Sequence, residues 1–562
     1  MSSPAHLVKT HWLSRNLVIV GLLSLVGLLL RLWKIGFGLP DLHFSNEELT
    51  TYPALNLASG DLNPHTFYHP NFYYYLFFAA DLAYILLGFL TGHFKAPGDG
   101  WELFKTDPTV FYVIGRSISA VLGTLTIPLT YWMGKKLFGE RTGVLGALFL
   151  TFCFVHVQWS QIAYMDAPLI FFVVVSFLFA LFALETGKTR YFMLCGLTGG
   201  LAASTKYQGI ETLYWGPLAS LLYDLNRSRV PLGALWNQRS WTSVLFFIVG
   251  FTGGTPFWIL SFPEFFAHLR DNWLWFNPSG QGHVGMEGNW NWAYYLMITL
   301  PYSIGIPVLV SALAGLIVLL GRMERRIFLF LSFPTVYFFI AGFSKIRQAK
   351  YLMPMIPFLC LAAGFFLVWG VEKFFARKKW APWILSVAGL FAVLPVLVSD
   401  LRYAYLKTLP DTRNLANTWV DVHVPLESKM AVTSATMWGS RPKGPKVVDL
   451  DPTLFDQRVN NRSSLRSLEE YRKEGFEYIV LDEWHLGSLF AEEAKNPKYH
   501  PTLQRYQRFL EDLKGSAELV AVFSPYQDDT HSFDRENVSL ASRDLWNLKS
   551  LGPRVQIYQL GD

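Results

Sequence analysis

Long apolar runs recur along this sequence, and they limit what it can fold into more than any other feature. The first extends from Asn16 to Phe37, and further runs follow it at intervals up to about residue 399. A helix needs roughly 18–20 apolar residues to cross the hydrocarbon core of a bilayer, and several runs reach that length. The pattern predicts a polytopic membrane protein and argues against a soluble fold.

The composition supports this interpretation and excludes other classes. Of the 562 residues, 52% are hydrophobic and 16% are charged, whereas roughly 25% are charged in an average soluble protein. The formal net charge of +6 is small, and the basic residues stand in short clusters between apolar runs, so no nucleic-acid partner is expected. The three cysteines all lie in apolar segments, which leaves no disulfide framework and no CxxC motif.

The basic clusters predict the sidedness of the chain, because short cytoplasmic loops carry an excess of Lys and Arg. All of them share one side if the chain crosses only once between Phe37 and Lys135, and we assign that crossing to 109–133. The run 72–90 then lies in the interface, although a simple span remains an alternative. About eleven spans follow from this arrangement: 16–37, 109–133, 141–158, 166–185, 190–204, 208–224, 242–262, 292–320, 326–343, 350–372 and 381–399.

The same arrangement predicts the domains. Residues 1–400 form the transmembrane part, with a long first external loop at 38–108 and another at 263–291, whose Gly-rich stretch 280–285 suits a mobile cover. Residues 401–562 are polar, with a helical pattern at 412–424 and strand patterns at 476–481 and 555–560. The fold class expected is mainly α, a polytopic helical membrane protein with a C-terminal soluble α/β domain.

Two acidic positions on the external side are candidate catalytic groups. Glu47 and Glu48 follow Asn46 in the first loop, and Asp166 stands before a span. A carboxylate beside a membrane surface can serve as a general base for an acceptor. Each also has a plainer interpretation: Ser45 and the two glutamates suit a helix N-terminus, and Asp166 followed by Pro168 suits a helix cap. The topology places both acidic positions on one face, which favours a shared site.

Cations occur on the same face. Lys206 lies between two spans, and Arg347 and Lys350 lie beside Tyr351, while Arg116 stands inside the span 109–133. Ionisable groups at membrane depth are costly and usually functional, and a phosphate head group suits them. Snorkelling toward anionic lipid is the alternative for the lysines, and Arg116 needs a partner such as a loop carboxylate.

The sequence gives no clear metal site. His65 and His69 have the i, i+4 spacing of a helical metal site, but Pro64 and Pro70 disfavour a regular helix there. No cofactor is expected. A divalent cation remains possible, without a clear set of ligands. Phosphate-loop and dinucleotide-binding motifs are absent from any suitable context.

A series of short motifs, in order and with matching sidedness, resembles one family over most of residues 16–372. The chain is similar to the GT-C type of membrane glycosyltransferases, which use polyprenyl-phosphate sugars and include protein O-mannosyltransferases and the lipid A aminoarabinose transferase. The motifs are Gly60-Asp61-Leu62-Asn63-Pro64-His65, Tyr68-His69-Pro70, Gly115-Arg116-Ser117, Gly134-Lys135-Lys136-Leu137-Phe138-Gly139, Tyr164-Met165-Asp166-Ala167-Pro168, Ala203-Ser204-Thr205-Lys206-Tyr207 and Lys350-Tyr351-Leu352-Met353-Pro354.

The resemblance implies a sugar donor carried on a lipid phosphate, an external catalytic face and no nucleotide sugar. The family's Asp-Glu pair falls on Asn46 and Glu47, so a neutral amide stands where the family has an acid. Asp166 matches the family's second acidic position. Lys206 and the pair Lys350-Tyr351 match positions expected near the donor phosphate, with Arg347 and Arg116 as further candidates.

We therefore expect transfer of a sugar from a polyprenyl-phosphate carrier to an acceptor hydroxyl, with inversion. Glu47 is the first choice as base, Asp166 the second, and Glu48 could take over the role. The class of acceptor stays open between a lipid, a glycan and a protein. The alternatives are a transporter or lipid flippase, and a binding module on an inactive core. The resemblance implies a bacterial inner membrane, with a cytoplasmic N-terminus and a periplasmic or extracellular C-terminal domain.

Overall fold

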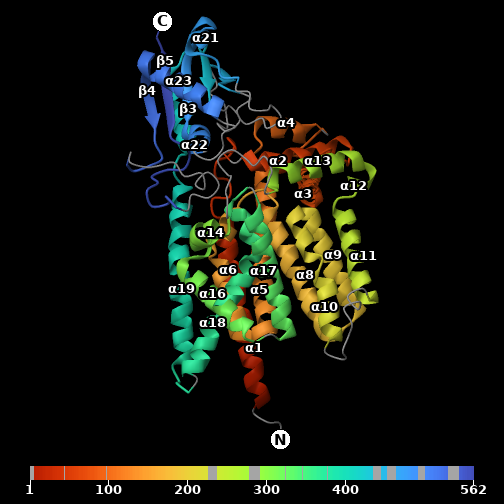
Figure 1. The fold of residues 1–562 in the computed structure, drawn as a ribbon. Coiled ribbons are helices and arrows are strands. Elements are labelled where there is room, and N and C mark those ends of the chain that lie inside the picture. Colours follow the sequence, from red (N-terminus) through yellow and green to blue (C-terminus); the bar gives the residue numbers. More distant parts are fainter. Residues whose placement is uncertain are drawn as a thin grey trace.

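The chain forms a helical bundle with a small mixed sheet at one end (Figure 1). In this computed structural model the N-terminus lies at the opposite end of the bundle, and we call the other end the sheet end. The residues described are 5–43, 45–96, 98–225, 237–277, 291–322, 324–344, 346–375, 377–433, 445–451, 464–491, 500–528 and 543–561.

The bundle contains most of the helices, and their apolar faces form one continuous core. Its helices are α1 (Ala5–Leu32), α5 (Thr109–Phe138), α6 (Glu140–Thr151), α7 (Phe154–Trp159), α8 (Asp166–Thr186), α9 (Thr189–Thr205), α10 (Trp215–Asp224), α11 (Gln238–Gly254), α14 (Asn291–Tyr294), α15 (Leu300–Ile304), α16 (Ile306–Leu320), α17 (Arg325–Phe343), α18 (Ile356–Phe375) and α19 (Ala381–Leu406). Short segments of 3-10 helix connect some of them: η3 (Tyr207–Thr212) precedes α10 and η6 (Ala349–Met355) precedes α18.

Seven helical stretches of the described chain are long and apolar enough to cross a membrane, and an eighth is obtained if α14–α16 count as one bent span. The chain is thus an integral membrane protein with seven or eight candidate spans, fewer than the eleven expected from hydropathy. The stretches are Arg15–Leu32, Phe72–Leu90, Thr109–Phe138, Asp166–Thr186, Arg325–Phe343, Ala349–Phe375 and Ala381–Leu406.

The difference in number arises because the helices at four expected spans are short. The run 141–158 is broken at Phe152 and Cys153 into α6 and α7, and the run 208–224 divides into η3 and α10. Helices α9 and α11 have 17 residues each, which is at the short end of the lengths found for membrane spans. Between α15 and α16 the chain bends by 120° at Gly305, whose φ of +82° is a conformation that glycine adopts at no steric cost.

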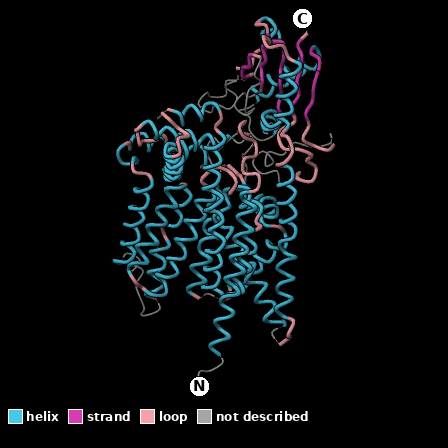
Figure 2. The backbone as a smooth tube through the Cα atoms, turned by 180° about the vertical axis from the view of Figure 1, so that it is seen from behind, coloured by secondary structure: helices cyan, strands magenta, loops and turns pink. Residues whose placement is uncertain are grey.

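A layer of helices from two loops lies across the sheet end. They are α2 (Glu48–Asn56), α3 (Phe72–Leu90) and α4 (Asp99–Thr106), together with α12 (Phe257–Leu260) and α13 (Phe262–Phe276) from the later loop. Helix α3 lies level with α2 and α13 and is seen nearly end-on both from the front and from behind (Figures 1 and 2). It packs on α2, α5 and α9. By composition α3 could also cross a membrane, but its direction agrees with the interfacial position expected for 72–90.

Basic residues meet at the end of the bundle opposite the sheet. Lys136 at the end of α5 pairs with Glu185 at the end of α8, and Arg326 at the start of α17 lies 3.6 Å from the same carboxylate. The helix ends that carry the expected cytoplasmic clusters therefore come together in space.

The C-terminal region is a sheet covered by helices on both faces. The strands are β1 (Lys429–Val432), β2 (Lys446–Asp449), β3 (Phe476–Asp482), β4 (Ala517–Phe523) and β5 (Val555–Leu560), in the order β2-β1-β3-β5-β4. The pairs of β1 are parallel and those of β5 antiparallel. One face packs against α20 (Thr412–His423), and the other packs against α21 (Leu468–Lys473) and α23 (His500–Ser516), with α22 (Glu483–Ala491) following β3.

Alternation along the strands explains the two covered faces. In β3, Tyr478 and Val480 belong to the cluster with α20, whereas Ile479 and Leu481 belong to the cluster with α21 and α23, as the period of two in a strand requires. The expected helix at 412–424 and the strands at 476–481 and 555–560 are confirmed to within a residue.

Candidate active site

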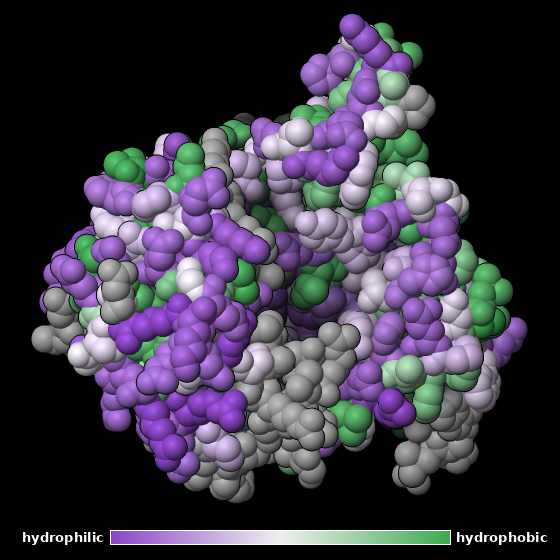
Figure 3. Space-filling model, turned by 90° about the horizontal axis from the view of Figure 1, so that it is seen from above, coloured by the Kyte–Doolittle hydropathy of each residue, from purple (hydrophilic) through white to green (hydrophobic). Residues whose placement is uncertain are grey.

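Seen from the sheet end, the molecule is hollowed near its centre, and both hydrophobic and hydrophilic residues lie at the bottom of the hollow (Figure 3). Three charged side chains expected from the sequence come together in the bundle near this end. Asp166 is the first residue of α8, Lys206 follows α9 and Lys350 lies in η6. All three are buried, with exposed fractions of 1%, 7% and 4%.

One ion pair organises this cluster. Lys206 Nζ donates to Asp166 Oδ1 at 2.7 Å, while Asp166 Oδ2 is buried without a hydrogen-bond partner among the described residues. Met165 occupies the N-cap position of α8 and Asp166 is its first residue, so Asp166 is not the cap of this helix. Because buried carboxylate oxygens are nearly always hydrogen-bonded, this unpartnered oxygen is a candidate position for binding a further group.

Aromatic rings surround both ammonium groups. Lys350 Nζ lies 4.7 Å from the ring centre of Trp159 and 4.8 Å from that of Tyr164. Lys206 Nζ lies 5.5 Å from Tyr164 and 5.4 Å from Tyr351. These distances are those of cation–π contacts. A ring face stabilises a cation less than an anion does. Two ammonium groups share the single carboxylate of Asp166, so a further anion would be stabilised here.

His69 also belongs to the cluster, a position that was not predicted for it. Its Nε2 lies 3.0 Å from the hydroxyl of Tyr164. Burial, followed by the charges of Lys206 and Lys350, lowers the pKa of His69 to about 3. The imidazole is therefore neutral at pH 7 and fixes the ring that faces both lysines. The signal that could have indicated it is the motif Tyr68-His69-Pro70.

Glu47 has a different environment. Its carboxylate accepts from Arg116 Nε at 2.8 Å and from Arg116 Nη2 at 2.6 Å, and the backbone N–H of Ala163 donates to Oε1 at 2.7 Å. Arg116 Nη1 donates to the carbonyl oxygens of Ile35 and Phe37. Both side chains are fully buried. The expectation that Arg116 pairs with a loop carboxylate is confirmed, and the pair connects the first loop to α5 and to the turn before α8.

The remaining candidates have other neighbours. Asn46 is half-buried in the turn of 3-10 helix η1 (Ser45–Glu47) that precedes α2. Glu48 lies near Tyr52 and Tyr112, and burial raises its pKa. The guanidinium of Arg347 lies 4.0 Å from the ring centre of Tyr294.

No described group of three or more His, Cys, Asp or Glu side chains is arranged to hold a metal ion. His65 and His69 both lie outside helices. His65 is exposed and contacts Asp61, whereas His69 is buried against Tyr164. The two histidines therefore do not converge on one site. The Gly-rich stretch 280–285, expected to form a cover, lies outside the described residues.

Comparisons with known proteins agree with this architecture. Residues 112–249 match the family model of dolichyl-phosphate-mannose-protein mannosyltransferases. No curated protein matches the sequence.

Solved structures match nearly the whole chain. An archaeal oligosaccharyltransferase, AglB from Archaeoglobus fulgidus in complex with an inhibitory peptide and a dolichol-phosphate, has a TM-score of 0.55 at 12% identity, over 98% of this chain and 89% of its own. ArnT from Cupriavidus metallidurans bound to undecaprenyl phosphate has a TM-score of 0.52 at 16% identity, over 98% of this chain and 99% of its own. The chain is thus an integral membrane protein with the GT-C fold that it shares with these membrane transferases.

Proposed function

We propose that this protein transfers a sugar from a polyprenyl-phosphate carrier to an acceptor hydroxyl, at the end of the bundle that carries the sheet. The observation that carries the proposal is the pair of buried lysines, Lys206 and Lys350, beside the unpartnered oxygen of Asp166. Two structures with the same fold were solved with a dolichol-phosphate and with undecaprenyl phosphate. A lipid phosphate is the kind of anion that two buried ammonium groups bind well.

The lysines are proposed as the groups that bind the donor phosphate. Among the described residues, Lys350 Nζ has ring faces as its neighbours and makes no hydrogen bond or ion pair. A phosphate oxygen at this position would supply the missing counter-charge. Charge on that phosphate increases as the sugar departs, so cations in a site with little water stabilise the transition state more than the ground state.

Asp166 is the better placed base. Both oxygens of Glu47 are occupied by Arg116 and Ala163, and the amide of Asn46 cannot accept a proton as a base. Asp166 Oδ2 has unused capacity to accept one. These contacts reverse the order expected from the sequence, and they favour Glu47 and Arg116 as a pair that positions the first loop.

The reaction then balances without a further reactant. The acceptor oxygen attacks the anomeric carbon, its proton passes to Asp166, and the bond from that carbon to the phosphate oxygen breaks. The polyprenyl phosphate leaves with the electron pair and is stabilised by Lys206 and Lys350. Attack from the side opposite the phosphate gives inversion. Because phosphate is a good leaving group, a separate general acid is not required.

The test is transfer from a radiolabelled polyprenyl-phosphate sugar pool by purified protein in lipid vesicles. Asp166→Asn and Lys350→Met should each lower turnover about 10²- to 10³-fold. Lys188→Met is the matched control, because Lys188 is exposed in the turn between α8 and α9 at the opposite end of the bundle. Wild type without transfer from any donor, beside a working transferase, would contradict the proposal and favour a transporter, a flippase or an inactive core, which uptake and lipid-scrambling assays then separate.

A further inference from the structure

The exposed face of α13 carries large apolar side chains, where a helix on a soluble protein would carry polar ones. Phe262, Phe266, Leu269 and Trp273 follow one another at i, i+4, i+7 and i+11, so they form a single stripe along the helix. Between 36% and 68% of each of these residues is exposed. Among the described residues of α13, Arg270 beside the stripe is the charged residue that is exposed.

Hydrogen-bonding side chains of α13 contact the first loop instead. His268 Nδ1 accepts from the backbone N–H of Phe67 at 3.1 Å, and Asn272 Nδ2 donates to the carbonyl oxygen of Tyr68 at 2.8 Å. On the same side Phe265 is buried, with its ring centre 5.7 Å from that of Phe67. The helix therefore bonds to protein with its polar groups and presents large apolar groups outward.

The stripe continues an apolar surface that begins on the side of the bundle. Helix α11 runs along the bundle, whereas α13 lies across the sheet end (Figure 1). Trp241, Leu245 and Ile248 of α11 are exposed at helical spacing, and Ile259 and Leu260 of α12 are exposed between α11 and α13. In a membrane protein the exposed apolar side of a bundle helix faces lipid. The surface that continues it onto α12 and α13 has the same chemistry.

We propose that this outer face of α12 and α13 lies in the lipid leaflet at the sheet end, so that its partner is the bilayer. A helix in the interface has its apolar face among the acyl chains and its charges at the headgroups, where tryptophan is also enriched. Trp273 fits that level, and the long side chain of Arg270 can reach the headgroups from it. A docked protein is disfavoured, because it would have to cover an apolar surface that extends down the side of the bundle.

Described contacts connect this helix with the lysine cluster. Phe67 and Tyr68 bond to α13, and the next residue, His69, bonds to Tyr164. The ring of Tyr164 contacts both lysines. A helix held at the surface of the leaflet therefore places the cluster near the headgroups. The use of this placement rests on the proposed function, because the phosphate of a lipid carrier lies at that level.

The test is the accessibility of spin labels on the full-length protein in phosphatidylcholine vesicles, with no other protein present. Phe266→Cys and Trp273→Cys each place a label on the stripe, and the three native cysteines are buried, so they do not take the label in the folded protein. Relaxation by oxygen, which concentrates in hydrocarbon, is compared with relaxation by a neutral nickel chelate, which stays in water. Leu390→Cys, exposed in α19, gives the lipid reference, and Glu511→Cys, exposed in α23, gives the water reference.

Both stripe labels should have an oxygen-to-nickel ratio several-fold above that of the Glu511 label. The two ratios should also agree with each other, because a helix that lies flat keeps two positions about 10 Å apart at one depth. Ratios equal to that of the Glu511 label would overturn the inference, and so would a large difference between the two stripe labels. Spectra broadened by a neighbouring label would also overturn it, because a second copy of the chain would then cover the stripe. Thermal unfolding confirms that each variant is folded.

The connection with the lysine cluster has its own measurement. The double variant Phe266→Gln/Trp273→Gln weakens the contact with lipid and should raise the KM for the donor several-fold, with little change in kcat. Trp383→Gln is the control, since Trp383 is exposed near the start of α19 at the opposite end of the bundle. An unchanged KM in the double variant would overturn the connection. A wild type that transfers no sugar refutes the proposed function alone, because the label ratios do not depend on transfer.

Discussion

Glu47→Gln should destabilise the protein strongly, because it removes one charge of a fully buried ion pair. In the structure the Glu47 carboxylate accepts three hydrogen bonds, two from Arg116 and one from Ala163 N–H. The amide of glutamine has one acceptor oxygen, and its NH₂ group would face the Arg116 guanidinium. Removing one partner of a buried pair leaves an uncompensated charge and costs about 3–5 kcal/mol. We expect a loss in the free energy of unfolding of that order.

The three cysteines supply the assay. Cys153, Cys195 and Cys360 are all buried in the bundle, so a thiol-reactive fluorogenic dye reports unfolding as the temperature rises. Glu372→Gln is the matched control, since Glu372 forms an exposed pair with Arg141 at 3.4 Å. Exposed pairs contribute about 0–1 kcal/mol. The double variant Glu47→Gln/Arg116→Met removes both charges and should cost less than the sum of its single changes.

One result would refute this reasoning. If Glu47→Gln unfolds at the temperature of Glu372→Gln but transfers no sugar, the carboxylate is not needed for the fold and acts in the reaction. Glu47 would then be the base, and Asp166 would lose the role proposed here. Loss of transfer together with loss of stability, restored in part by the second substitution, supports Glu47 as a positioning residue.

Three further changes test other parts of the molecule. Gly196→Ala places a Cβ about 2.0 Å from the Ser243 carbonyl oxygen, where α9 meets α11. It should lower the free energy of unfolding by about 1–3 kcal/mol. Gly253→Ala is its control in the same dye assay, because a Cβ there meets nothing within 4 Å. Burial, then the charge of Arg413, lowers the pKa of His43. Below about pH 6.5 the folded state therefore binds fewer protons than the unfolded chain. The contribution of His43 to stability is complete above that pH and falls as the pH decreases. The unfolding temperature should drop between pH 7.5 and 5.5, and it should drop less in His43→Gln. Tyr164→Phe loses the hydrogen bond to His69 and should lower the free energy of unfolding by about 1 kcal/mol, with little change in the KM for the donor. Tyr164→Leu also removes the ring that contacts both lysines, and it should raise that KM.

The cluster of Asp166, Lys206 and Lys350 could be found from the sequence because charged residues are conspicuous in apolar segments. Lys206 and Lys350 each interrupt the pattern of the spans beside them, and Asp166 begins one. Sidedness then places the three at one end of the bundle, and the structure brings them within contact of shared rings. His69 could not be assigned in this way. A histidine in a loop with two prolines has no period to indicate which way it faces.

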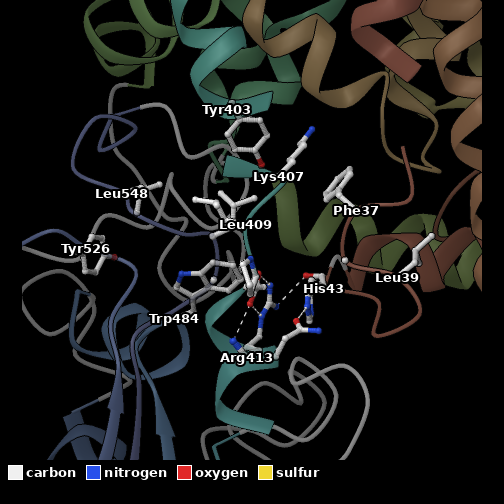
Figure 4. A pocket seen from close by; sticks show the side chains of 16 residues that line it. Phe37, Leu39, His43, Tyr403, Lys407, Leu409, Arg413, Trp484, Tyr526 and Leu548 are labelled. Atoms are coloured by element: carbon white, nitrogen blue, oxygen red, sulfur yellow. Dashed lines mark hydrogen bonds and ion pairs between the residues drawn. The ribbon is translucent and has the colours of Figure 1, made fainter. Parts of the chain in front are cut away.

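The cavity of about 220 Å³ between the bundle and the C-terminal region (Figure 4) could not be found from the sequence at all. Its walls come from residue 37, from the end of α19 and from positions 484 and 526, which no local pattern connects. The number of spans expected from the sequence exceeds the seven or eight candidates of the described chain for a related reason. Hydropathy reports the length of an apolar run, but not the breaks at Phe152 and Gly305 that divide such runs into shorter helices.

Two ion pairs that look alike in the sequence differ in what they leave unused. Glu47 with Arg116 and Asp166 with Lys206 each join a carboxylate in or beside a loop to a cation near a span. In the first pair every oxygen of the carboxylate is occupied, so it has nothing to offer a substrate. In the second, one oxygen of Asp166 is unpartnered, and Lys206 uses a single hydrogen bond among the described residues. Because the proposed reaction depends on the unpartnered oxygen of Asp166 and not on an acid in the first loop, the amide at Asn46 does not exclude it.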